Sequence, residues 1–462
     1  MAGATKWPAM GGLLDSRYEG ISPGLGSLAH GRIAEASGVY RPRHPERTSF
    51  YRIFEQHFPT YVGTYEERFE HRCGPLRPVV SRTVEAFLDC GRLVNGFARI
   101  RCPTCGGEHL LAFSCQTRNF CPSCQAKRAA LFAERLAGEI AAPVPHRHIV
   151  FTIPKVLRGL FQRERRLLGL LSRCAYQAVR RAFATYLDDR RASPGFVASI
   201  QTFGSYAANF HPHIHALVTE GAFSPAGEFL PVGTVNEGVL EELFRRLVLR
   251  SLHRQERLSE EFRDNLLSWV HSGFSVHAGP RLYPTDPKSF ERLGRYVVRV
   301  PMPQKDVRLT PEGQVQVTTP VDPRTGRSEL LLDPLEWIHS VVQQIPAPRQ
   351  HMVRYYGAYA NRRRRRLRQA SQEKAEATSA GPAEEEPVAP RASWARLLHR
   401  ILEIDPLLCP KCQVEMKIVS VITEPAVIDR ILAHIRETGG RDPFDERGPP
   451  EGKAIGVGAV AA

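Results

Sequence analysis

Three features of the sequence predict an α+β fold with cysteine-rich segments near both ends. Apolar residues recur every three or four positions from Glu46 to Leu93, which is typical of helices. Alternation with a period of two, the signature of a half-buried strand, runs from Asn209 to Val218. Cys-x-x-Cys turns, which in intracellular proteins are typical of zinc ligands, lie between these stretches and again near the C-terminus. The predicted order is an N-terminal helical and zinc-ribbon module, an antiparallel sheet flanked by helices, and a small C-terminal Cys-x-x-Cys module.

The composition is that of a globular and strongly basic protein. Of its 462 residues, 63 are Lys or Arg and 48 are Asp or Glu, which gives a formal net charge of +15. Such an excess usually accompanies a polyanionic partner, most often nucleic acid, although some soluble proteins are basic without one. No apolar run approaches the roughly 18 residues of a membrane-spanning helix, and the start lacks the pattern of a secretory signal. We therefore expect a cytoplasmic protein with no membrane partner.

Changes in composition divide the chain into five segments. Gly, Pro and Ser without a sustained period predict a disordered N-terminal segment over residues 1–45. We expect a zinc-binding domain over 46–140 and the sheet with its flanking helices over 141–369. Ala, Glu, Ser and Pro predict a solvated linker over 370–392, and the small C-terminal module follows over 393–462.

Two Cys-x-x-Cys turns separated by 15 residues predict a structural zinc site. Each turn presents two thiolates to one tetrahedral ion, and the segment between the turns supplies a hairpin arm. The predicted ligands are Cys102, Cys105, Cys121 and Cys124. Cys90, His109 and Cys115 are further potential ligands, and Cys115 could replace one member of a pair or help to hold a second ion. Cys409 and Cys412 form half of a site, for which the sequence names no partners.

Histidines at every second position mark the predicted central strand. His211, His213 and His215 share one of its faces. Neutral imidazole nitrogens suit divalent cations, so this row is typical of a metal or phosphate site. The alternative is a strand with solvated histidines. His146 and His148 show the same spacing at the entry to another predicted strand, and we expect these two to be structural.

The stretch Gln350–Arg368 predicts a basic helix that carries two tyrosines on one face. Tyr355 and Tyr359 are four residues apart, about one helical turn. Helices rich in tyrosine are often core or interface elements. An unperturbed phenol, with a pKa of about 10, is a poor nucleophile at neutral pH. A divalent ion held by imidazoles would assist phenolate attack on a DNA phosphodiester, which leaves a covalent phosphotyrosine and a free 3′-hydroxyl.

A run of arginines follows the tyrosines. These guanidinium groups would contact the phosphate backbone and give a salt-dependent, sequence-independent affinity for DNA. The alternative is a solvated charged face that leads into the linker. The candidate DNA contacts are Arg354, Arg362, Arg363, Arg364, Arg365 and Arg366.

The ordered set of motifs resembles the two-tyrosine HUH transposases of the insertion-sequence-ninety-one family, which move DNA by a rolling-circle route. The resemblance spans roughly residues 50 to 370 and keeps the family's order of zinc module, HUH domain and tyrosine helix. The segments that carry it are Cys102–Cys105, Cys121–Cys124, Val144–Pro154, His211–His215 and Arg354–Tyr359.

The resemblance implies an HUH fold, an antiparallel sheet in which the histidine strand is central. It implies that His213 and His215 bind a catalytic Mg²⁺ or Mn²⁺ and that Tyr355 and Tyr359 are the nucleophiles. It also implies that the N-terminal zinc module helps to recognise element ends. The expected partner of the protein is DNA, especially single-stranded element ends, and the expected location is the bacterial cytoplasm, in association with the nucleoid. Such sites normally have a third protein ligand, for which Gln201 on the preceding strand is our first choice and His351 the second.

Two other functions fit parts of the sequence. In a histidine-triad nucleotide hydrolase or transferase, an imidazole is the nucleophile and no metal is needed, but the tyrosines, arginines and zinc site would be unexplained. In a zinc-ribbon DNA-binding regulator the histidines are structural and nothing is cleaved. Chelator-sensitive nicking of single-stranded DNA distinguishes a transposase from both. A further alternative is a degenerate transposase that folds but no longer acts.

Overall fold

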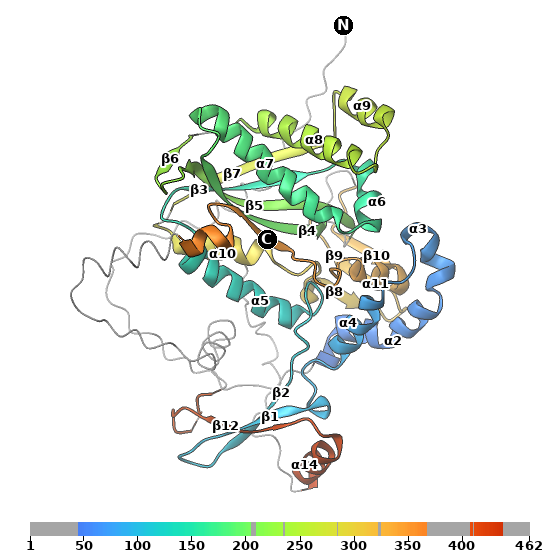
Figure 1. Cartoon of the computed structure of the whole chain (residues 1–462). Coiled ribbons are helices and arrows are strands. Elements are labelled where there is room, and N and C mark those ends of the chain that lie inside the picture. Colours follow the sequence, from blue (N-terminus) through green and yellow to red (C-terminus); the bar gives the residue numbers. More distant parts are fainter. Residues whose placement is uncertain are drawn as a thin grey trace, which may run out of the picture.

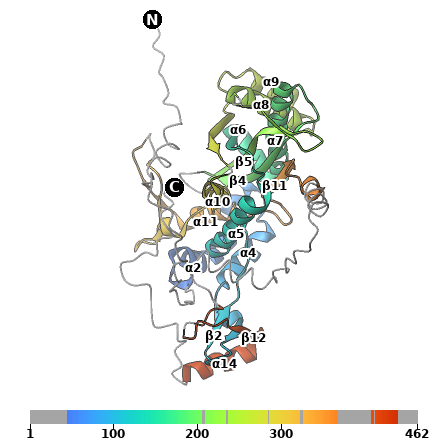
Figure 2. The ribbon, with the colours of Figure 1, turned by 90° about the vertical axis from the view of Figure 1, so that its left-hand side faces the viewer.

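The computed structural model has one large sheet at its centre, helices around it and a small sheet at one end (Figure 1, Figure 2). The residues that it describes are 45–204, 209–233, 236–283, 285–321, 325–366, 407–409 and 411–437. The predicted disordered segment 1–45, except its last residue, and the predicted linker 370–392 lie outside these ranges. Within them, no helix is both long enough and apolar enough to cross a lipid bilayer.

The N-terminal helices pack into an aromatic core of their own. They include α2 (Ser49–Gly63) and α4 (Pro78–Leu88), so the helical periodicity predicted for this part of the chain is confirmed. The helix α11 (Pro334–Val342) packs against them, and its fully buried Trp337 contacts the ring of Phe50 edge-on. A three-stranded sheet of order β10-β9-β8 adds to this core through β8 (Val307–Leu309), β9 (Val315–Thr318) and β10 (Glu329–Leu332).

The central sheet is antiparallel, with the order β11-β4-β5-β3-β7 and the short β6 paired to β5. The predicted histidine strand is β5, the middle strand of this order, and its prediction is confirmed. The strands are β3 (His146–Thr152), β4 (Ser193–Phe203), β5 (Phe210–Phe223), β6 (Phe229–Pro231), β7 (Ser275–Leu282) and β11 (Val353–Gly357).

One face of the central sheet is largely apolar and carries the largest core. Alternate residues such as Phe151, Phe196 and Ile214 point to this face because successive side chains of a strand lie on opposite sides. The helices that cover it are α6 (Lys155–Arg163), α7 (Leu167–Leu187), α8 (Glu237–His253) and α9 (Glu260–Ser268) (Figure 1).

The opposite face carries the histidines and is covered by α10 (Pro287–Val297), which packs against α5 (Pro122–Arg135). Small residues bring the two helices together, because a Cβ at Gly294 would lie only 2.7 Å from the Cα of Ala133. The polar face of the sheet is thus covered by a helix that begins about 75 residues after the histidines in the sequence.

The predicted tyrosine helix over Gln350–Arg368 is wrong. Residues 353–357 form the edge strand β11, which pairs with β4 so that Tyr355 lies opposite Val197. Within the described part of this stretch, 350–366, only residues 361–366 are helical. Aromatic and β-branched residues favour a pleated strand, and Gly357 ends it with a φ of +58°. A Cβ at Gly357 would overlap the carbonyl oxygen of Pro194, so this position requires glycine.

The C-terminal module belongs to the same small sheet as the first hairpin of the chain. This sheet has the order β12-β1-β2, and the residues of α14 pack on it (Figure 2). Its elements are β1 (Phe97–Arg101), β2 (Glu108–Ala112), β12 (Lys417–Ile422) and α14 (Pro425–Glu437). The described part of the predicted module 393–462 is therefore continuous with the predicted zinc-binding domain.

Candidate active site and cysteine clusters

Four imidazoles meet on the polar face of the central sheet. The period of β5 places His211, His213 and His215 on one side, and His148 of β3 lies beside them. The Nε2 atoms of His213 and His215 are 3.1 Å apart, and His148 Nε2 is 2.9 Å from His215 Nδ1. His148, which the sequence analysis took as structural, is thus a direct partner of the histidine row.

The partners of the two Nδ1 atoms leave both Nε2 atoms available as metal ligands. His213 Nδ1 donates to the backbone oxygen of His211 at 2.7 Å. In the tautomer with its proton on Nδ1, His215 donates in the same way to His148. The two Nε2 lone pairs then face one another, at the separation expected for adjacent ligands about 2.1 Å from one cation.

Gln201 offers a third candidate donor atom from the strand beside the histidines. It lies directly opposite His213 in the ladder of β4 and β5 and is only 3% exposed. Its amide nitrogen donates to the carbonyl oxygens of Val297 at 2.9 Å and Tyr296 at 3.3 Å, whereas its Oε1 is buried and has no hydrogen-bond partner among the described residues. A buried carbonyl without a partner is costly, and a cation would satisfy it. The two imidazoles and this amide oxygen therefore fit a divalent ion. His351, the second choice for the third ligand, is exposed and lies just before β11 begins.

Burial keeps the imidazoles neutral at physiological pH. It lowers the pKa of His213 and of His148 to about 4 and that of His215 well below its usual value. The positive charge of Arg299 acts in the same direction on the pKa values of His213 and His215. Neutral rings retain the lone pairs that a metal ligand requires.

A tyrosine that the sequence analysis did not single out lies against the imidazoles. Tyr296, near the end of α10, has its ring centroid 5.4 Å from that of His215 and 6.2 Å from that of His148. The guanidinium carbon of Arg299 lies 4.7 Å from the centre of the same ring. Tyr296 is partly exposed. No motif marks it, because only packing of α10 across the sheet brings it to the histidines.

The structure does not bring Tyr359 to the histidine row. Its hydroxyl lies 2.5 Å from Nε2 of His146 and accepts the backbone N–H of Ala142 at 2.9 Å. Only 3% of the residue is exposed, and burial raises the pKa of its phenol. His146 was expected to be structural. It is buried, and its ring is the hydrogen-bond partner of the Tyr359 hydroxyl.

Tyr355 shares the histidine face of the sheet but lies further from the imidazoles than Tyr296. In the ladder it lies opposite Val197, which in turn faces Leu217 of β5. It is thus two strands away, roughly 10 Å across the sheet. Burial raises the pKa of its phenol, and the guanidinium carbon of Arg364 lies 4.8 Å from its ring centre.

The predicted DNA-binding arginines fall into two groups. Three of them contact the protein: the guanidinium of Arg354 lies against Gly169 of α7, Arg363 donates to the carbonyl oxygen of Ser224 at 2.7 Å, and Arg364 covers Tyr355. The other three are exposed: Arg362, Arg365 and Arg366. The exposed group is the part of the run that is open to a phosphate backbone.

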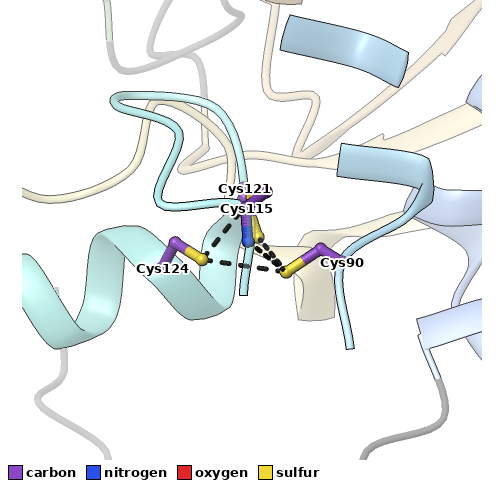
Figure 3. A group of neighbouring side chains, drawn as sticks. All are labelled: Cys90, Cys115, Cys121 and Cys124. Atoms are coloured by element: carbon purple, nitrogen blue, oxygen red, sulfur yellow. Dashed lines mark hydrogen bonds between the residues drawn. The ribbon is translucent and has the colours of Figure 1, made fainter. Parts of the chain in front are cut away.

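The predicted four-cysteine zinc ribbon is divided between two clusters. Cys121 and Cys124 lie with Cys90 and Cys115, two of the further ligands considered above (Figure 3). The Sγ distances within this cluster include 3.5 Å between Cys115 and Cys124 and 3.8 Å between Cys90 and Cys124. Four sulfurs around a tetrahedral zinc are about 3.8 Å apart, so this group fits one ion.

The other predicted pair, Cys102 and Cys105, lies with Cys409 and Cys412. The length of the first hairpin explains why the predicted grouping is wrong. Cys102 and Cys105 form the tip between β1 and β2, each of five residues, whereas the other pair follows the base of the hairpin. Tip and base are roughly 16 Å apart, too far for one ion. His109 lies on β2, outside both clusters.

Two family models match the chain. One is described as "Transposase zinc-binding domain" and matches residues 53–153, which include all four cysteines of the Cys90 cluster. The other is described as "Putative transposase" and matches residues 195–366, which include the histidine strand, α10 and the arginine run. Cys409 and Cys412 lie outside both matched ranges.

Curated relatives cover most of the chain. The chain is 25% identical over 363 residues to the "Transposase for insertion sequence element IS801" of Pseudomonas savastanoi pv. phaseolicola, a match that covers 74% of this chain and 84% of the relative. It is 28% identical over 333 residues to the "Putative transposase y4qJ" of Sinorhizobium fredii, with 65% and 79% covered. No solved structure matches the chain significantly.

Proposed function

Because the chain belongs to the insertion-sequence-ninety-one family of transposases and carries its zinc-binding domain, we propose that it cleaves and rejoins single-stranded DNA at insertion-sequence ends. In this proposal the reaction proceeds through a covalent 5′-phosphotyrosine and serves rolling-circle transposition in the bacterial cytoplasm. The observation that carries the proposal is the contact between Tyr296 and His215, because it unites a phenol with a pair of imidazoles whose Nε2 atoms converge.

We assign a catalytic Mg²⁺ or Mn²⁺ to His213, His215 and Gln201. The two Nε2 atoms at 3.1 Å and the buried, unpartnered Oε1 of Gln201 support this donor set. When bound there, such an ion polarises a phosphate oxygen and neutralises charge that develops in the transition state. His148 and the backbone of His211 hold the ligand rings in position through their Nδ1 atoms.

We propose Tyr296 as the nucleophile. Its phenolic oxygen forms a bond to the phosphorus while the bond from phosphorus to the 3′ oxygen breaks. The phenolic proton passes to water, and the departing 3′ oxygen takes up a proton. In the rejoining step a 3′-hydroxyl attacks the phosphotyrosine, and the tyrosine oxygen leaves. One phosphoester bond replaces another, so no external energy source is needed.

Arginine side chains near Tyr296 would bind the scissile phosphate. The guanidinium of Arg299 lies over the Tyr296 ring, and its positive charge also reaches the two metal-ligand candidates. The positive charge of Arg158 of α6 also lowers the pKa values of His211 and His213. A phosphate held between these charges would present its phosphorus to the phenol, and Arg299 would stabilise negative charge on the leaving and attacking oxygens.

The DNA strand would be held mainly through its backbone. Arg362, Arg365 and Arg366 are exposed beyond the edge strand β11 and can neutralise phosphates without selecting a sequence. Recognition of the element ends then falls to the zinc-binding domain.

The nucleophile roles expected for Tyr355 and Tyr359 stay predictions. We place Tyr296 before them because it contacts the imidazoles and is partly exposed. Tyr359 is engaged with His146, and Tyr355 is two strands away on the same face. If a second tyrosine takes part in strand exchange, the position of Tyr355 on the histidine face favours it over Tyr359.

A denaturing gel tests the proposed function. The full chain is incubated with single-stranded oligonucleotides that carry candidate terminal sequences, with Mg²⁺, with Mn²⁺ or with a chelator. We expect a covalent protein–DNA adduct in the presence of metal and none with the chelator. Absence of an adduct and of cleavage, with DNA binding intact, would favour the regulator. A phosphohistidine formed without metal would favour the nucleotide hydrolase.

A further inference from the structure

We infer that Cys102, Cys105, Cys409 and Cys412 form a second zinc site, which joins the C-terminal segment of the chain to the zinc-binding domain. Their four sulfur atoms lie within 4.8 Å of one another. The Sγ atoms of Cys105 and Cys409, 304 residues apart in the sequence, are separated by 3.6 Å. This site is independent of the DNA chemistry proposed above.

The two turns that meet there have the same backbone hydrogen bonds. The N–H of Cys102 donates to the oxygen of Gly107, five residues on, and the N–H of Cys409 donates to Val414, also five residues on. Likewise, the N–H of the residue after each turn donates back to the first cysteine of that turn, at 3.1 Å in one and 2.8 Å in the other.

The residue that follows each turn has a left-handed backbone. These residues are Gly106, with a φ of +69°, and Gln413, with a φ of +56°. A left-handed conformation is uncommon for a residue other than glycine, and its occurrence at Gln413 shows that the second turn is held in the shape of the first. Two matching turns that present their thiolates to one point are the arrangement of a closed four-thiolate zinc site.

The third Cys-Pro-x-Cys sequence of the chain has a different local structure. Cys121 caps α5, the N–H of Gln125 donates to its carbonyl oxygen at 2.9 Å, and Cys124 lies within the first turn of the helix. This pair belongs to the Cys90 cluster. The three similar sequences thus divide by conformation, with the two non-helical turns facing each other.

The small sheet has too few buried residues to hold the C-terminal segment unaided. Besides the cysteines, the buried residues of its two clusters are Ile100, Leu407, Met416, Phe97, Leu110 and Ile428. Four of the six residues of β12 are exposed, and they include Val419 and Val421. Small units of this kind usually need a metal or a disulfide. A zinc ion that binds two thiolates from each segment supplies that restraint.

Metal content tests the site in the full-length chain. We expect two zinc ions per chain in the purified protein and one in either double variant, Cys102→Ser/Cys105→Ser or Cys409→Ser/Cys412→Ser. The variant that lacks all four thiols should also keep one ion, because the two pairs serve one site. Lys411→Ser, an exposed change within the turn itself, is the matched control and should keep two. Cys174→Ser, at a cysteine outside both clusters, controls for the loss of a thiol.

Two results would overturn this assignment. One is the retention of both ions by Cys409→Ser/Cys412→Ser. The other is a disulfide between any of the four cysteines in protein purified without reductant but with zinc. Alkylation of the unaltered protein gives a test that does not depend on variants folding. Partial chelation should make all four cysteines of this site reactive to the alkylating agent together. If Cys102 and Cys105 instead become reactive together with Cys121 and Cys124, the single zinc ribbon predicted from the sequence would be correct.

Cobalt substitution adds a spectroscopic test. Co²⁺ in the place of zinc should give the thiolate charge-transfer bands of a tetrahedral four-sulfur site, with about half the intensity lost in Cys409→Ser/Cys412→Ser. Hydrogen exchange in residues 417–437 should then rise at least tenfold in that variant. Unchanged exchange there would show that no metal holds β12 and α14 in place.

Discussion

The ring of Tyr296 packs edge-on against the ring of His215, with centroids 5.4 Å apart and planes at 87°. This contact joins the end of α10 to the middle strand of the central sheet, two elements about 80 residues apart in the sequence. His215 Nε2 lies 3.1 Å from His213 Nε2, and Gln201, with its unpartnered Oε1, lies opposite His213 in the ladder. The guanidinium carbon of Arg299 lies 4.7 Å from the centre of the Tyr296 ring. A phenol, the proposed metal ligands and the guanidinium proposed to bind phosphate are thus neighbours on this face of the sheet.

Removal of the Gln201 oxygen should weaken metal binding. Gln201→Leu deletes the unpartnered Oε1 and keeps the volume, so we expect the affinity for Mn²⁺ to fall by about 10- to 100-fold. Calorimetric titration with Mn²⁺ measures this change. Ser199→Ala is the matched control, because Ser199 also donates to the oxygen of Val297 but is not in the proposed ligand set. An unchanged affinity in Gln201→Leu would remove Gln201 from the ligand set.

Arg299 should matter for the chemical step rather than for folding. Arg299→Gln removes the charge above Tyr296, and we expect the single-turnover cleavage rate to fall by about 10²- to 10³-fold. Arg299→Lys should recover part of the rate. The control is Arg295→Gln, an exposed change on α10 next to Tyr296, which should leave the rate within about twofold. Equal rates in the Arg299 and Arg295 variants would contradict the assigned role.

The exposed arginines should set the salt dependence of DNA binding. The double change Arg365→Gln/Arg366→Gln should lower the slope of log affinity against log salt by about 1.4, since each single-strand phosphate contact contributes about 0.7. Fluorescence anisotropy with a labelled single strand measures the slope. A double change at Arg190 and Arg191, which are exposed beyond α7, removes the same charge and should leave the slope unchanged. Equal slopes in both variants would mean that the arginine run is only a solvated face.

Stability should fall as the pH drops from 6.5 toward 4. Burial lowers the pKa of His146 to about 4, so in this window the unfolded chain binds a proton that the folded chain does not. The contribution is complete above pH 6.5 and is lost on acidification, with a slope of roughly 1.4 kcal/mol per pH unit for each such imidazole. His146→Asn, which does not titrate, should show a slope smaller by about one proton in urea unfolding measured from pH 4 to 7. Identical slopes for the two proteins would contradict the burial of a neutral ring.

Gly357 should be intolerant of a side chain. Its φ is +58°, and a Cβ there would overlap the carbonyl oxygen of Pro194. We expect Gly357→Ala to lower the free energy of unfolding by about 1–3 kcal/mol. Gly138→Ala is the control, because no heavy atom lies within 4 Å of its Cβ position. If both variants unfold at the same urea concentration, the left-handed turn after β11 is not required.

The sequence predicts the histidine strand and the N-terminal helices well because their patterns are local. A period of two identifies β5, and the recurrence of apolar residues every three or four positions identifies α2 and α4. For the stretch around Tyr355, the local pattern does not decide between a helix and a strand. Spacing of four favours a helix, whereas pairing with β4 and the turn at Gly357 favour a strand, and the tertiary contacts prevail.

The site and the cysteine grouping depend on contacts that no local pattern records. Tyr296 reaches the histidines only because Gly294 and Ala133 let α10 and α5 pack closely over the sheet. Cys102 and Cys105 are grouped with two cysteines of a turn that lies about 300 residues further along the sequence. Spacing in the sequence suggested the nearer pair, but the length of the hairpin separates the two turns.

Identification of the tyrosine that carries DNA tests the central claim most directly. After reaction with a single-stranded element end and Mn²⁺, the adduct is digested with nuclease and protease, and the peptide that bears the residual nucleotide is sequenced by mass spectrometry. The account predicts a phosphodiester on Tyr296 and no adduct in Tyr296→Phe, whereas Tyr359→Phe should still form one. A nucleotide on Tyr355 or Tyr359, with Tyr296→Phe as reactive as the unaltered protein, would contradict it.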